Sequence, residues 1–343
     1  MKKARIAING FGRIGRLFLR EAWNNENIEI VAINDLGDLE NLAYLLRHDT
    51  VYRGFDKEVR VDLDKHCLVV DGKEIAVLKE KDPAALPWSL MDIDIALECT
   101  GLFESFEGVR AHIKAGAKRA IISAPGKDEE KEDAKTILMG VNDKDIPQCV
   151  VTSNGSCTTN ATSPVVTILS EEVGIAKAML STVHAYTATQ SLVDGPVKGG
   201  KDFRRGRAAA QNIVPSSTGA AVSVARAIPE LYGKFDGIAL RVPTVSGSLS
   251  DITMLMKRPV TKEEVNDILR RAAASERWKG ILAVSDDQLV SSDVLAYPAA
   301  SIVDAPFTKV VDGDMVKVLA WYDNEYGYVT TLVKHVEKMA ATL

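Results

Sequence analysis

The sequence predicts an α/β fold whose first half forms an open, doubly wound parallel sheet. The apolar run Ala4–Asn9 (ARIAIN) is typical of a buried strand, and a glycine-rich stretch and an amphipathic helical pattern follow it directly. Further short apolar runs recur as far as residue 126, and the last two end in small residues. At 343 residues the chain is long enough for two domains, each with its own core.

The amino-acid composition is that of a soluble globular protein and argues against several other classes of protein. Apolar residues make up 46% of the chain and charged residues 26%, as in soluble globular proteins, and the net charge of −5 argues against a nucleic-acid-binding surface. The first apolar run meets Gly10 too early to be a signal sequence or a membrane span. We therefore expect a cytoplasmic protein that binds neither nucleic acid nor membrane. The cysteines show no CxxC pair, so we expect neither a disulfide framework nor a metal site: they are Cys67, Cys99, Cys149 and Cys157.

The glycine-rich stretch Gly10–Gly15 (GFGRIG) lies between the first strand and the first helix, whose apolar pattern continues to Trp23. In this context Gly10 permits a tight turn, Gly12 lets backbone N–H groups approach a pyrophosphate, and Gly15 lets the helix pack on the strand. The helix N-terminus then faces the anion. A plain turn is the alternative, because this pattern also occurs by chance.

A carboxylate at the expected distance favours the dinucleotide interpretation. The next apolar run, Ile28–Ile33, leads into Asn34 and Asp35, and Asp35 lies twenty residues after Gly15. An acid at that distance accepts hydrogen bonds from the adenosine ribose and repels a 2′-phosphate. The first half is therefore predicted to be a Rossmann-type domain that binds NAD in preference to NADP.

Later strands place further residues at the same edge of the sheet. We expect strands at Leu68–Val70, Ile75–Leu78, Ile93–Gly101 and Arg119–Gly126, and a solvated loop or helix over the charged run Lys127–Lys135. Ligands of open parallel sheets bind beyond the carboxyl ends of the strands, which makes Thr100, Gly101 and Ser123 candidate cofactor residues. Ordinary strand-to-loop turns would explain the same three residues.

The second half contains a candidate nucleophile. Ala161–Gly174 has the apolar pattern of a helix, so Cys157 in SNGSCTTN lies near a helix N-terminus, where we expect its thiol pKa to be lowered. A candidate base, His184, stands in an alternating segment typical of a strand. Spacing alone does not bring the two side chains together, and a buried, inert cysteine remains the alternative.

These motifs resemble a known family. SNGSCTTN, followed 27 residues after its cysteine by the histidine of HAYTATQ, closely resembles the active-site signature of the phosphorylating, NAD-dependent glyceraldehyde-3-phosphate dehydrogenases. NGFGRIGR, AAAQNIVPSSTGAA, IPELYGK, RVPT and WYDNEYGY resemble further blocks of that family, in the same order over nearly the whole chain. On this resemblance the chain is identified as a member of the family.

The resemblance implies a reaction and its residues. Cys157 would attack the aldehyde of glyceraldehyde 3-phosphate, His184 would act as the base, and inorganic phosphate would release 1,3-bisphosphoglycerate from a thioester, a step of glycolysis and gluconeogenesis. The N–H of Cys157 would donate to the oxyanion. Thr187 and Arg241 match the family's site for the substrate phosphate. The residues that match its site for inorganic phosphate are Ser156, Thr158, Thr218 and Gly219.

The resemblance also implies the domain organisation. Residues 1–155 would form the NAD-binding domain, completed by a C-terminal helix within 324–343, and residues 156–323 an α+β catalytic domain with a mixed or antiparallel sheet. Asn324 would read the nicotinamide carboxamide. The other candidate cofactor residues are Gly10, Phe11, Gly12, Arg13, Ile14, Asp35, Lys81, Thr100, Gly101 and Ser123.

Some features are less typical of the family. Ala161 stands where a second cysteine is common, the loop Val197–Arg207 is about two residues longer than usual, and Thr244–Asp251 departs from the common sequence. The loop follows Gly195–Pro196, a pair that resembles NAD-preferring members, and it lies between subunits in the family's homotetramer, the assembly expected here. Two alternative functions remain: an erythrose-4-phosphate dehydrogenase, and a regulatory protein that binds NAD without catalysis.

Overall fold

The computed structural model describes residues 3–197 and 201–343. Contacts divide the chain into two compact units. The first unit comprises Met1–Ile137, Asn142–Gly155 and Leu332–Leu343, and the second comprises Leu138–Val141 and Ser156–Thr331. Part of the long loop Val197–Arg207, residues 198–200, lies outside the described residues.

The first unit is built on a largely parallel sheet, which has nine strands in the described part of the chain. The order is β3-β4-β5-β2-β1-β6-β7-β9-β8, and every pair from β5 to β8 is parallel. The strands are β1 (Ala4–Asn9), β2 (Ile28–Asn34), β3 (Val59–Asp62), β4 (Cys67–Val70), β5 (Lys73–Leu78), β6 (Ile95–Glu98), β7 (Arg119–Ile122), β8 (Ala134–Thr136) and β9 (Val151–Ser153). The prediction of a doubly wound sheet is confirmed.

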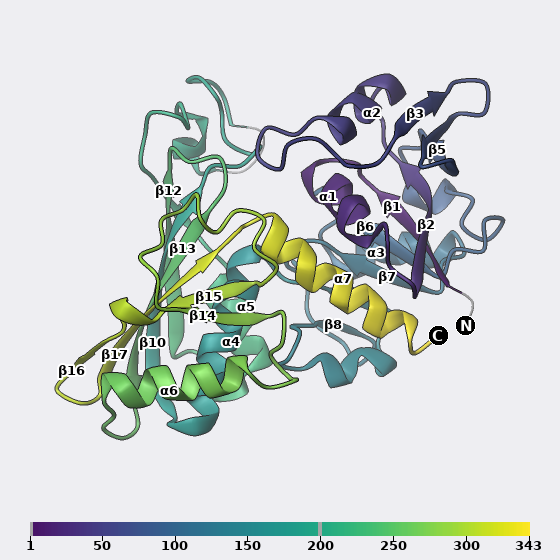
Figure 1. Cartoon of the computed structure of the whole chain (residues 1–343). Helices are drawn as coiled ribbons and strands as arrows, with labels where there is room; N and C mark the ends of the chain where they lie inside the picture. The colour runs from purple at the N-terminus through teal and green to yellow at the C-terminus, as the bar shows by residue number, and fades with distance from the viewer. Residues whose placement is uncertain (1–2, 198–200) are drawn as a thin grey trace. The chain divides into compact units, whose positions relative to one another are not determined.

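The order of strands reverses between β1 and β6. From β1 the chain first adds β2 on one side and later adds β6 on the other, so their carboxyl ends form a topological switch point (Figure 1). β6 and β7 end earlier than expected, at Glu98 and Ile122. The small residues that follow them belong to loops, and Gly101 has a positive φ of 70° that ends the extended conformation. The small residues therefore lie beyond the sheet edge.

Over its described residues, the first unit contains three whole α-helices and part of a fourth, and two of the whole helices have a side-chain N-cap. They are α1 (Arg13–Ala22), α2 (Leu39–Arg47), α3 (Phe106–Lys114) and the larger part of α7 (Tyr326–Ala340). The Asp38 carboxylate caps α2 and the Ser105 hydroxyl caps α3. The N-cap of α1 is Gly12, which offers no side chain to the first N–H groups. This helix start therefore keeps backbone donors for an external anion.

The last helix joins the first unit through a buried histidine. His335 Nε2 lies 3.0 Å from Thr152 Oγ1 on β9, and His335 Nδ1 lies 3.1 Å from Asn154 Oδ1. The helix begins at Tyr326, within the range 324–343 expected for it. The C-terminal segment thus returns to the unit that contains the N-terminus.

The second unit is built on a mixed sheet, which has eight strands among the described residues, in the order β11-β12-β10-β13-β17-β15-β14, with β16 beside β17. β10 pairs with β12 in parallel and with β13 antiparallel. The strands are β10 (Ile175–Ala185), β11 (Val214–Ser217), β12 (Phe235–Val242), β13 (Ser248–Met256), β14 (Leu282–Ser285), β15 (Ser301–Asp304), β16 (Lys309–Val311) and β17 (Met315–Tyr322). The prediction of an α+β domain with a mixed sheet is confirmed.

Three helices cover one face of this sheet: α4 (Cys157–Glu172), α5 (Ala220–Ala227) and α6 (Lys262–Ala273) (Figure 1). Leu169 of α4 and Leu269 of α6 join Ile252 and Val318 of the sheet in one buried cluster. Short 3₁₀ turns elsewhere lie at Pro83–Ala85, Asp143–Gln148, Phe203–Gly206, Pro229–Leu231 and Ala305–Phe307. Within the described ranges, none of the helices is both long enough and apolar enough to cross a membrane.

Candidate active site

Cys157 is the first residue of α4. The Ser156 hydroxyl caps the helix by accepting a hydrogen bond from the Thr159 N–H at 3.1 Å. The helix begins four residues earlier than the apolar pattern from Ala161 indicates, because Thr158, Thr159 and Asn160 are buried although they are polar. Periodicity of apolar residues cannot detect a first turn that is buried on every side.

The structure brings the candidate nucleophile and base together. His184 lies near the end of β10, and its Nε2 is 3.4 Å from Cys157 Sγ. His184 Nδ1 is 2.6 Å from the carbonyl oxygen of Ala185, which can only accept a hydrogen bond, so Nδ1 carries the proton. In the neutral ring Nε2 is therefore the acceptor that faces the thiol.

Burial sets the charge state of this pair. The Cys157 sulfur is closely surrounded by protein atoms, and this burial raises the pKa of its thiol above the ordinary value. Hydrogen bonds from the start of α4 and the charge of Arg241 act in the opposite direction but are smaller. Burial, aided by Arg241, also lowers the pKa of His184 to about 4. The expectation of a lowered thiol pKa is wrong for the protein alone, since desolvation outweighs the helix terminus.

A buried tyrosine connects the two elements that carry the pair. The Tyr322 hydroxyl, at the end of β17, lies 3.0 Å from Thr158 Oγ1 and 2.7 Å from Thr182 Oγ1. Its ring meets the His184 ring edge to face, with centroids 5.9 Å apart. Burial raises the pKa of the Tyr322 hydroxyl, so it remains protonated. Sequence reasoning assigned Tyr322 no role, although it stands in the WYDNEYGY motif.

Arg241 supplies a positive charge beside the histidine. It lies directly opposite His184 in the parallel pairing of β12 with β10. One Arg241 Nη1 donates to Thr187 Oγ1 at 3.3 Å and to Gln190 Oε1 at 3.4 Å. Burial lowers the pKa of Arg241, and within the described residues its Nε and the Gln190 Nε2 are buried without a hydrogen-bond partner. Buried donors without acceptors, one of them on a cation, suit an anionic ligand.

A second arginine, Arg205, lies near Arg241, and we call the two the arginine cluster. Arg205 is not among the candidate residues that the sequence predicts. Arg205 Nη1 donates to Thr189 Oγ1 at 3.3 Å, and the charge of Arg205 contributes to the lowered pKa values of Arg241 and His184. Two cations are thus held near one another beside threonine hydroxyls. Like charges at close range favour the binding of an anion between them. The sequence signal was weak, since Arg205 is one of three arginines in FRRGR.

The remaining candidate phosphate residues have local roles in the structure. The Ser156 hydroxyl caps α4, and the Thr158 hydroxyl contacts Tyr322. Thr218 Oγ1 accepts a hydrogen bond from the Ala220 N–H at 3.2 Å, and Gly219 is the N-cap of α5. Backbone N–H groups at two helix starts, those of α4 and α5, therefore remain the donors that this set offers to an anion.

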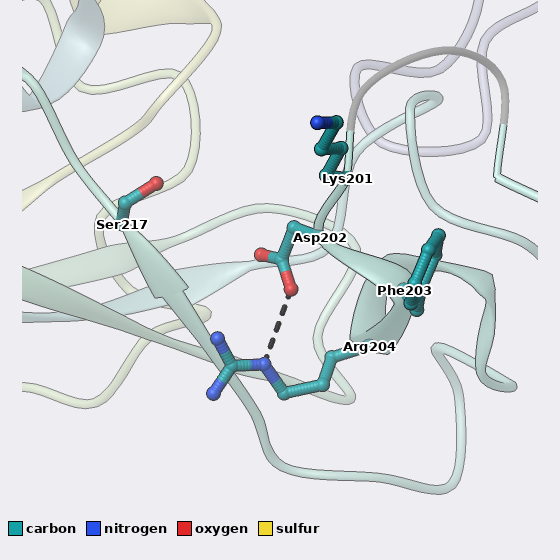
Figure 2. Close-up of a pocket in the computed structure, with 5 residues that line it drawn as sticks. All are labelled: Lys201, Asp202, Phe203, Arg204 and Ser217. Atoms are coloured by element: carbon teal, nitrogen blue, oxygen red, sulfur yellow. Dashed lines mark hydrogen bonds and ion pairs between the residues drawn. The ribbon is translucent and has the colours of Figure 1, made fainter.

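A separate cavity of about 400 Å³ is not lined by the candidate catalytic residues. It is lined by Lys201, Asp202, Phe203, Arg204 and Ser217 (Figure 2). Arg204 Nε donates to Asp202 Oδ1 at 3.1 Å, so the charge of the arginine is already balanced. Cys157, His184 and Arg241 do not line it. We therefore do not assign the active site to this cavity.

In the first unit, the glycine loop fits the phosphates of a dinucleotide. Gly10 has a positive φ of 95°, and a Cβ there would lie 2.6 Å from the Thr100 nitrogen. A Cβ on Gly15 would lie 2.3 Å from the Gly10 carbonyl oxygen, whereas a Cβ on Gly12 would meet nothing within 4 Å. These positions match the predicted roles: a tight turn at Gly10, close packing of the helix at Gly15, and an open approach to the backbone at Gly12. NAD is the cofactor that this loop fits.

A cavity of about 260 Å³ opens beside the loop at the switch point. The candidates Gly10, Gly12, Asp35, Lys81 and Thr100 line it. The carboxylate of Asp35 also holds the loop, since it accepts hydrogen bonds from the N–H of Phe11 at 2.7 Å and of Gly37 at 2.8 Å. The other residues that line the cavity are Asn9, Asn34, Leu36, Glu80, Cys99, Leu102 and Phe103.

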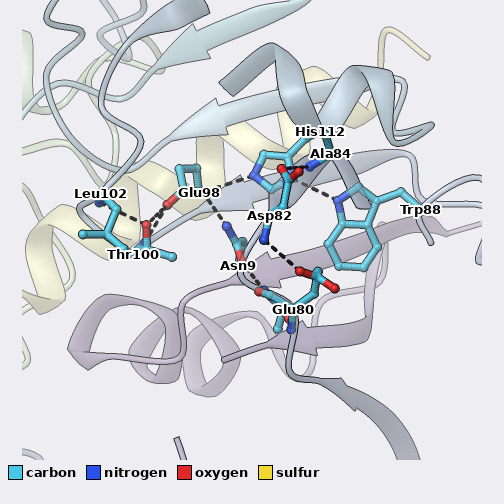
Figure 3. A network of polar contacts seen from close by, with 10 residues as sticks. Asn9, Glu80, Asp82, Ala84, Trp88, Glu98, Thr100, Leu102 and His112 are labelled. Atoms are coloured by element: carbon cyan, nitrogen blue, oxygen red, sulfur yellow. Dashed lines mark hydrogen bonds and ion pairs between the residues drawn. The ribbon is translucent and has the colours of Figure 1, made fainter. Parts of the chain in front are cut away.

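A buried polar network, drawn in Figure 3, includes Asn9 and Thr100, which also line this cavity. Glu98 accepts hydrogen bonds from Asn9 Nδ2 at 2.6 Å and from the Thr100 N–H at 2.8 Å, and its Oε2 lies 3.1 Å from His112 Nε2. Asn9 Oδ1 in turn accepts from Asn34 Nδ2 at 2.7 Å. The network connects the ends of β1, β2 and β6. It explains why polar residues can be buried at this edge of the sheet.

Other cofactor candidates have partners of their own. Arg13 pairs with Asp49 at 2.5 Å, the Phe11 side chain is fully buried, and Ser123 hydrogen-bonds the Cys99 thiol. Ile14 lies in the first turn of α1. In the second unit, the Asn324 side chain is buried and accepts a hydrogen bond from Ser248 Oγ at 2.8 Å.

Comparison with known proteins finds relatives for both units of the chain. Residues 4–106 match the family model of the glyceraldehyde 3-phosphate dehydrogenase NAD binding domain, and residues 156–324 match that of the C-terminal domain. The chain is 49% identical to the glyceraldehyde-3-phosphate dehydrogenase of Geobacillus stearothermophilus, over 94% of each protein. It is 47% identical to that of Streptomyces coelicolor over 96% of each, and 45% identical to glyceraldehyde-3-phosphate dehydrogenase 2 of Bacillus subtilis over 97% of each.

Proposed function

Because the chain belongs to the glyceraldehyde 3-phosphate dehydrogenase family, we propose that it oxidises glyceraldehyde 3-phosphate with NAD and inorganic phosphate to 1,3-bisphosphoglycerate. The observation that carries the proposal is the 3.4 Å approach of His184 Nε2 to Cys157 Sγ at the start of α4. It unites a nucleophile, a base and the backbone donors of a helix start. Acyl transfer through sulfur needs these three elements.

Cys157 and His184 carry the covalent steps. The sulfur forms a bond to the aldehyde carbon as the thiol proton moves to His184 Nε2 and then to the new oxygen, giving a thiohemiacetal. When the thiohemiacetal is oxidised, Nε2 takes the hydroxyl proton and the sulfur is left in a thioester. A phosphate oxygen then bonds to the carbonyl carbon, the carbon–sulfur bond breaks, and the imidazolium returns its proton to the sulfur.

The pKa values of the pair fit this sequence of proton transfers. A His184 pKa lowered to about 4 keeps Nε2 unprotonated near neutral pH, so that it is ready to accept a proton. The N–H groups at the start of α4 stabilise the oxyanion of the thiohemiacetal, since no preceding turn uses them. His184 Nε2 is therefore unprotonated before the reaction, and the thiol loses its proton to it as the carbon–sulfur bond forms.

The arginine cluster binds the phosphate groups. Arg241, with its buried Nε, and Arg205 supply two positive charges beside Thr187 and Gln190. We assign the phosphate of the substrate to Arg241 and Thr187. The inorganic phosphate is assigned to N–H groups at the helix starts that carry Ser156, Thr158, Thr218 and Gly219.

The cofactor is held by the first unit and supplies the hydride acceptor when bound. The glycine loop with Arg13 and Ile14 would hold the pyrophosphate, Asp35 the adenosine ribose, and Asn324 the nicotinamide carboxamide. Lys81, Thr100, Gly101 and Ser123 would complete the wall of the site. Under this proposal residues 1–155, with the C-terminal helix, form the NAD-binding domain, and residues 156–323 form the catalytic domain.

We also propose a cytoplasmic homotetramer. The face of the second sheet opposite the helices exposes large apolar side chains, among them Ile238, and Met179 and Met315, which line a cavity of about 490 Å³. Such a face suits a second copy of the same sheet. Sedimentation of the Met179→Glu variant tests this assignment: a smaller assembly supports it, and an unchanged mass contradicts it.

Phosphate-dependent formation of NADH from glyceraldehyde 3-phosphate tests the proposed function. The assay is run with and without inorganic phosphate, with NAD and with NADP, and with erythrose 4-phosphate as the competing aldehyde. We expect rapid turnover only with the triose, phosphate and NAD together. Turnover that is indifferent to phosphate, or faster with the tetrose, contradicts the proposal.

A further inference from the structure

Two serines bracket the side chain of Asn324. Ser248, the first residue of β13, donates from its hydroxyl to Asn324 Oδ1 at 2.8 Å. Ser246, two residues earlier, donates to the same oxygen at the longer distance of 3.3 Å and to Asp323 Oδ1 at 2.9 Å. All four side chains are buried. The stronger hold on the Asn324 amide is therefore that of Ser248.

The backbone decides the direction of the hydrogen bond from Ser248. The N–H of Ala185 donates to Ser248 Oγ at 3.1 Å. Because an N–H can only donate, that bond uses one lone pair of the hydroxyl oxygen, and the oxygen also contacts the Tyr322 hydroxyl, while the hydroxyl proton is directed to Asn324 Oδ1 at 2.8 Å. A hydroxyl that donates to Asn324 meets the amide oxygen and not the amide nitrogen. In the opposite flip, Asn324 Nδ2 would have to share an oxygen that already accepts from the Ala185 N–H and contacts the Tyr322 hydroxyl.

The same residue, Ala185, also anchors the catalytic base. Its carbonyl oxygen accepts the hydrogen bond from His184 Nδ1 at 2.6 Å, and its N–H is the donor to Ser248. One residue at the end of β10 thus fixes the ring of His184 on one side and the hydroxyl of Ser248 on the other. The base and the Asn324 amide are oriented from a common point on the backbone.

We propose that Ser248 is a positioning residue that presents Asn324 Nδ2 as the donor to the nicotinamide carboxamide oxygen. With Oδ1 held by Ser248, only the amide nitrogen remains to meet the cofactor, and a donor there fixes which face of the nicotinamide ring receives the hydride. This inference rests on the proposed function, because it takes from it the role of Asn324. It adds the residue that determines the amide's orientation.

The test compares Ser248→Ala with Ser250→Ala. Ser250 lies on the same strand and the same buried face, but its hydroxyl lies 3.4 Å from Thr162 Oγ1, away from Asn324. Each purified holoenzyme oxidises deuterated glyceraldehyde 3-phosphate, and the face of the NADH ring that carries deuterium is determined by NMR. The Kd for NAD is measured separately by calorimetry, without aldehyde.

For Ser248→Ala we expect deuterium on both faces of the ring and a Kd for NAD raised about five- to tenfold, as for the loss of one neutral hydrogen bond. Ser250→Ala is expected to keep transfer to a single face, and Ser248→Thr, which retains the hydroxyl, is expected to restore it. Transfer to a single face with an unchanged Kd in Ser248→Ala overturns the inference. If the wild-type protein does not oxidise the aldehyde at all, that result contradicts the proposed function and not this inference.

Discussion

Cys157 Sγ and His184 Nε2 lie 3.4 Å apart, although 27 residues separate them in the chain. The contact arises because α4 packs on the sheet that contains β10, and the helix start meets the end of that strand. Burial keeps both groups neutral at rest, through a raised thiol pKa and a histidine pKa of about 4. We therefore expect the thiol to lose its proton to His184 as it reacts.

Replacement of the nucleophile separates chemistry from cofactor binding. We expect Cys157→Ser to lower phosphate-dependent NADH formation by at least about four orders of magnitude, because a serine hydroxyl is a far weaker nucleophile without its proton removed in advance. The Kd for NAD, measured by calorimetry, is expected to stay at the wild-type value, since the glycine loop lies in the first unit. Near-normal turnover would remove Cys157 from the mechanism.

Replacement of the base lowers kcat and alters its pH profile. We expect His184→Asn to lower kcat about 10²–10⁴-fold, because an amide can accept a hydrogen bond from the thiol but cannot take its proton. The lowered pKa of His184, about 4, favours the base form above that pH, so we expect the acid limb of the wild-type kcat/KM profile near pH 4. The variant should lack this limb. The same acid limb in both proteins would assign it to another group.

Much of the fold follows from short-range sequence patterns. The strand at Ala4–Asn9 and the glycine roles depend on neighbours in sequence, and the structure reproduces both. The order of the second sheet depends on pairings between distant segments, such as β13 with β17, which local periodicity does not specify. The family resemblance supplied the prediction of a mixed or antiparallel sheet, without its strand order.

The site was less predictable than the fold. Cys157 and His184 stand in distinctive motifs, but the net thiol pKa depends on burial, which the sequence does not reveal. Arg205 and Tyr322 reach the site through tertiary contacts alone. Conversely, Ser156 is of a residue type that often binds phosphate, yet its hydroxyl caps α4. Residue type suggested the chemistry, and packing assigned the individual roles.

Removal of the buried cation should affect phosphorylated substrates alone. We expect Arg241→Gln to raise the KM for glyceraldehyde 3-phosphate about 10- to 100-fold, which corresponds to the loss of charge-assisted hydrogen bonds worth about 1.5–3 kcal/mol. Unphosphorylated glyceraldehyde serves as the control, since it brings no anion to the cluster. A similar change in KM for both aldehydes would mean that Arg241 supports the fold of the site and not the phosphate.

The charge of Asp35 should determine the preference between cofactors. Asp35→Asn keeps an oxygen that can accept the Phe11 N–H, but it removes the negative charge and the second oxygen, which accepts from the Gly37 N–H. We expect the Kd for NAD to rise about tenfold and the Kd for NADP to fall, because the 2′-phosphate is no longer repelled. Asp38→Asn, which retains a good cap for α2, is the matched control and should change neither Kd. An unaltered ratio of the two Kd values in Asp35→Asn would contradict the assignment.

The buried His335 should make the stability of the protein depend on pH. Burial lowers its pKa to about 3, although the Asp143 carboxylate acts weakly in the other direction. A histidine in the unfolded chain has a pKa near 6.5, so between pH 6.5 and 3 the unfolded chain binds a proton that the folded protein does not. This group therefore contributes its full stabilisation above pH 6.5. The contribution falls with decreasing pH, by at most about 1.4 kcal/mol per pH unit.

The variant His335→Gln removes this titration while keeping a donor and an acceptor for Asn154 and Thr152. We expect it to be less stable than the wild type at pH 7 by about 1–3 kcal/mol, since its amide cannot match both contacts. In urea unfolding between pH 7 and pH 4, that difference should shrink steadily as the wild type loses stability. The exposed His48→Gln variant is the control and should follow the wild type throughout. A constant difference between His335→Gln and the wild type across this range would show that the histidine is not kept neutral by burial.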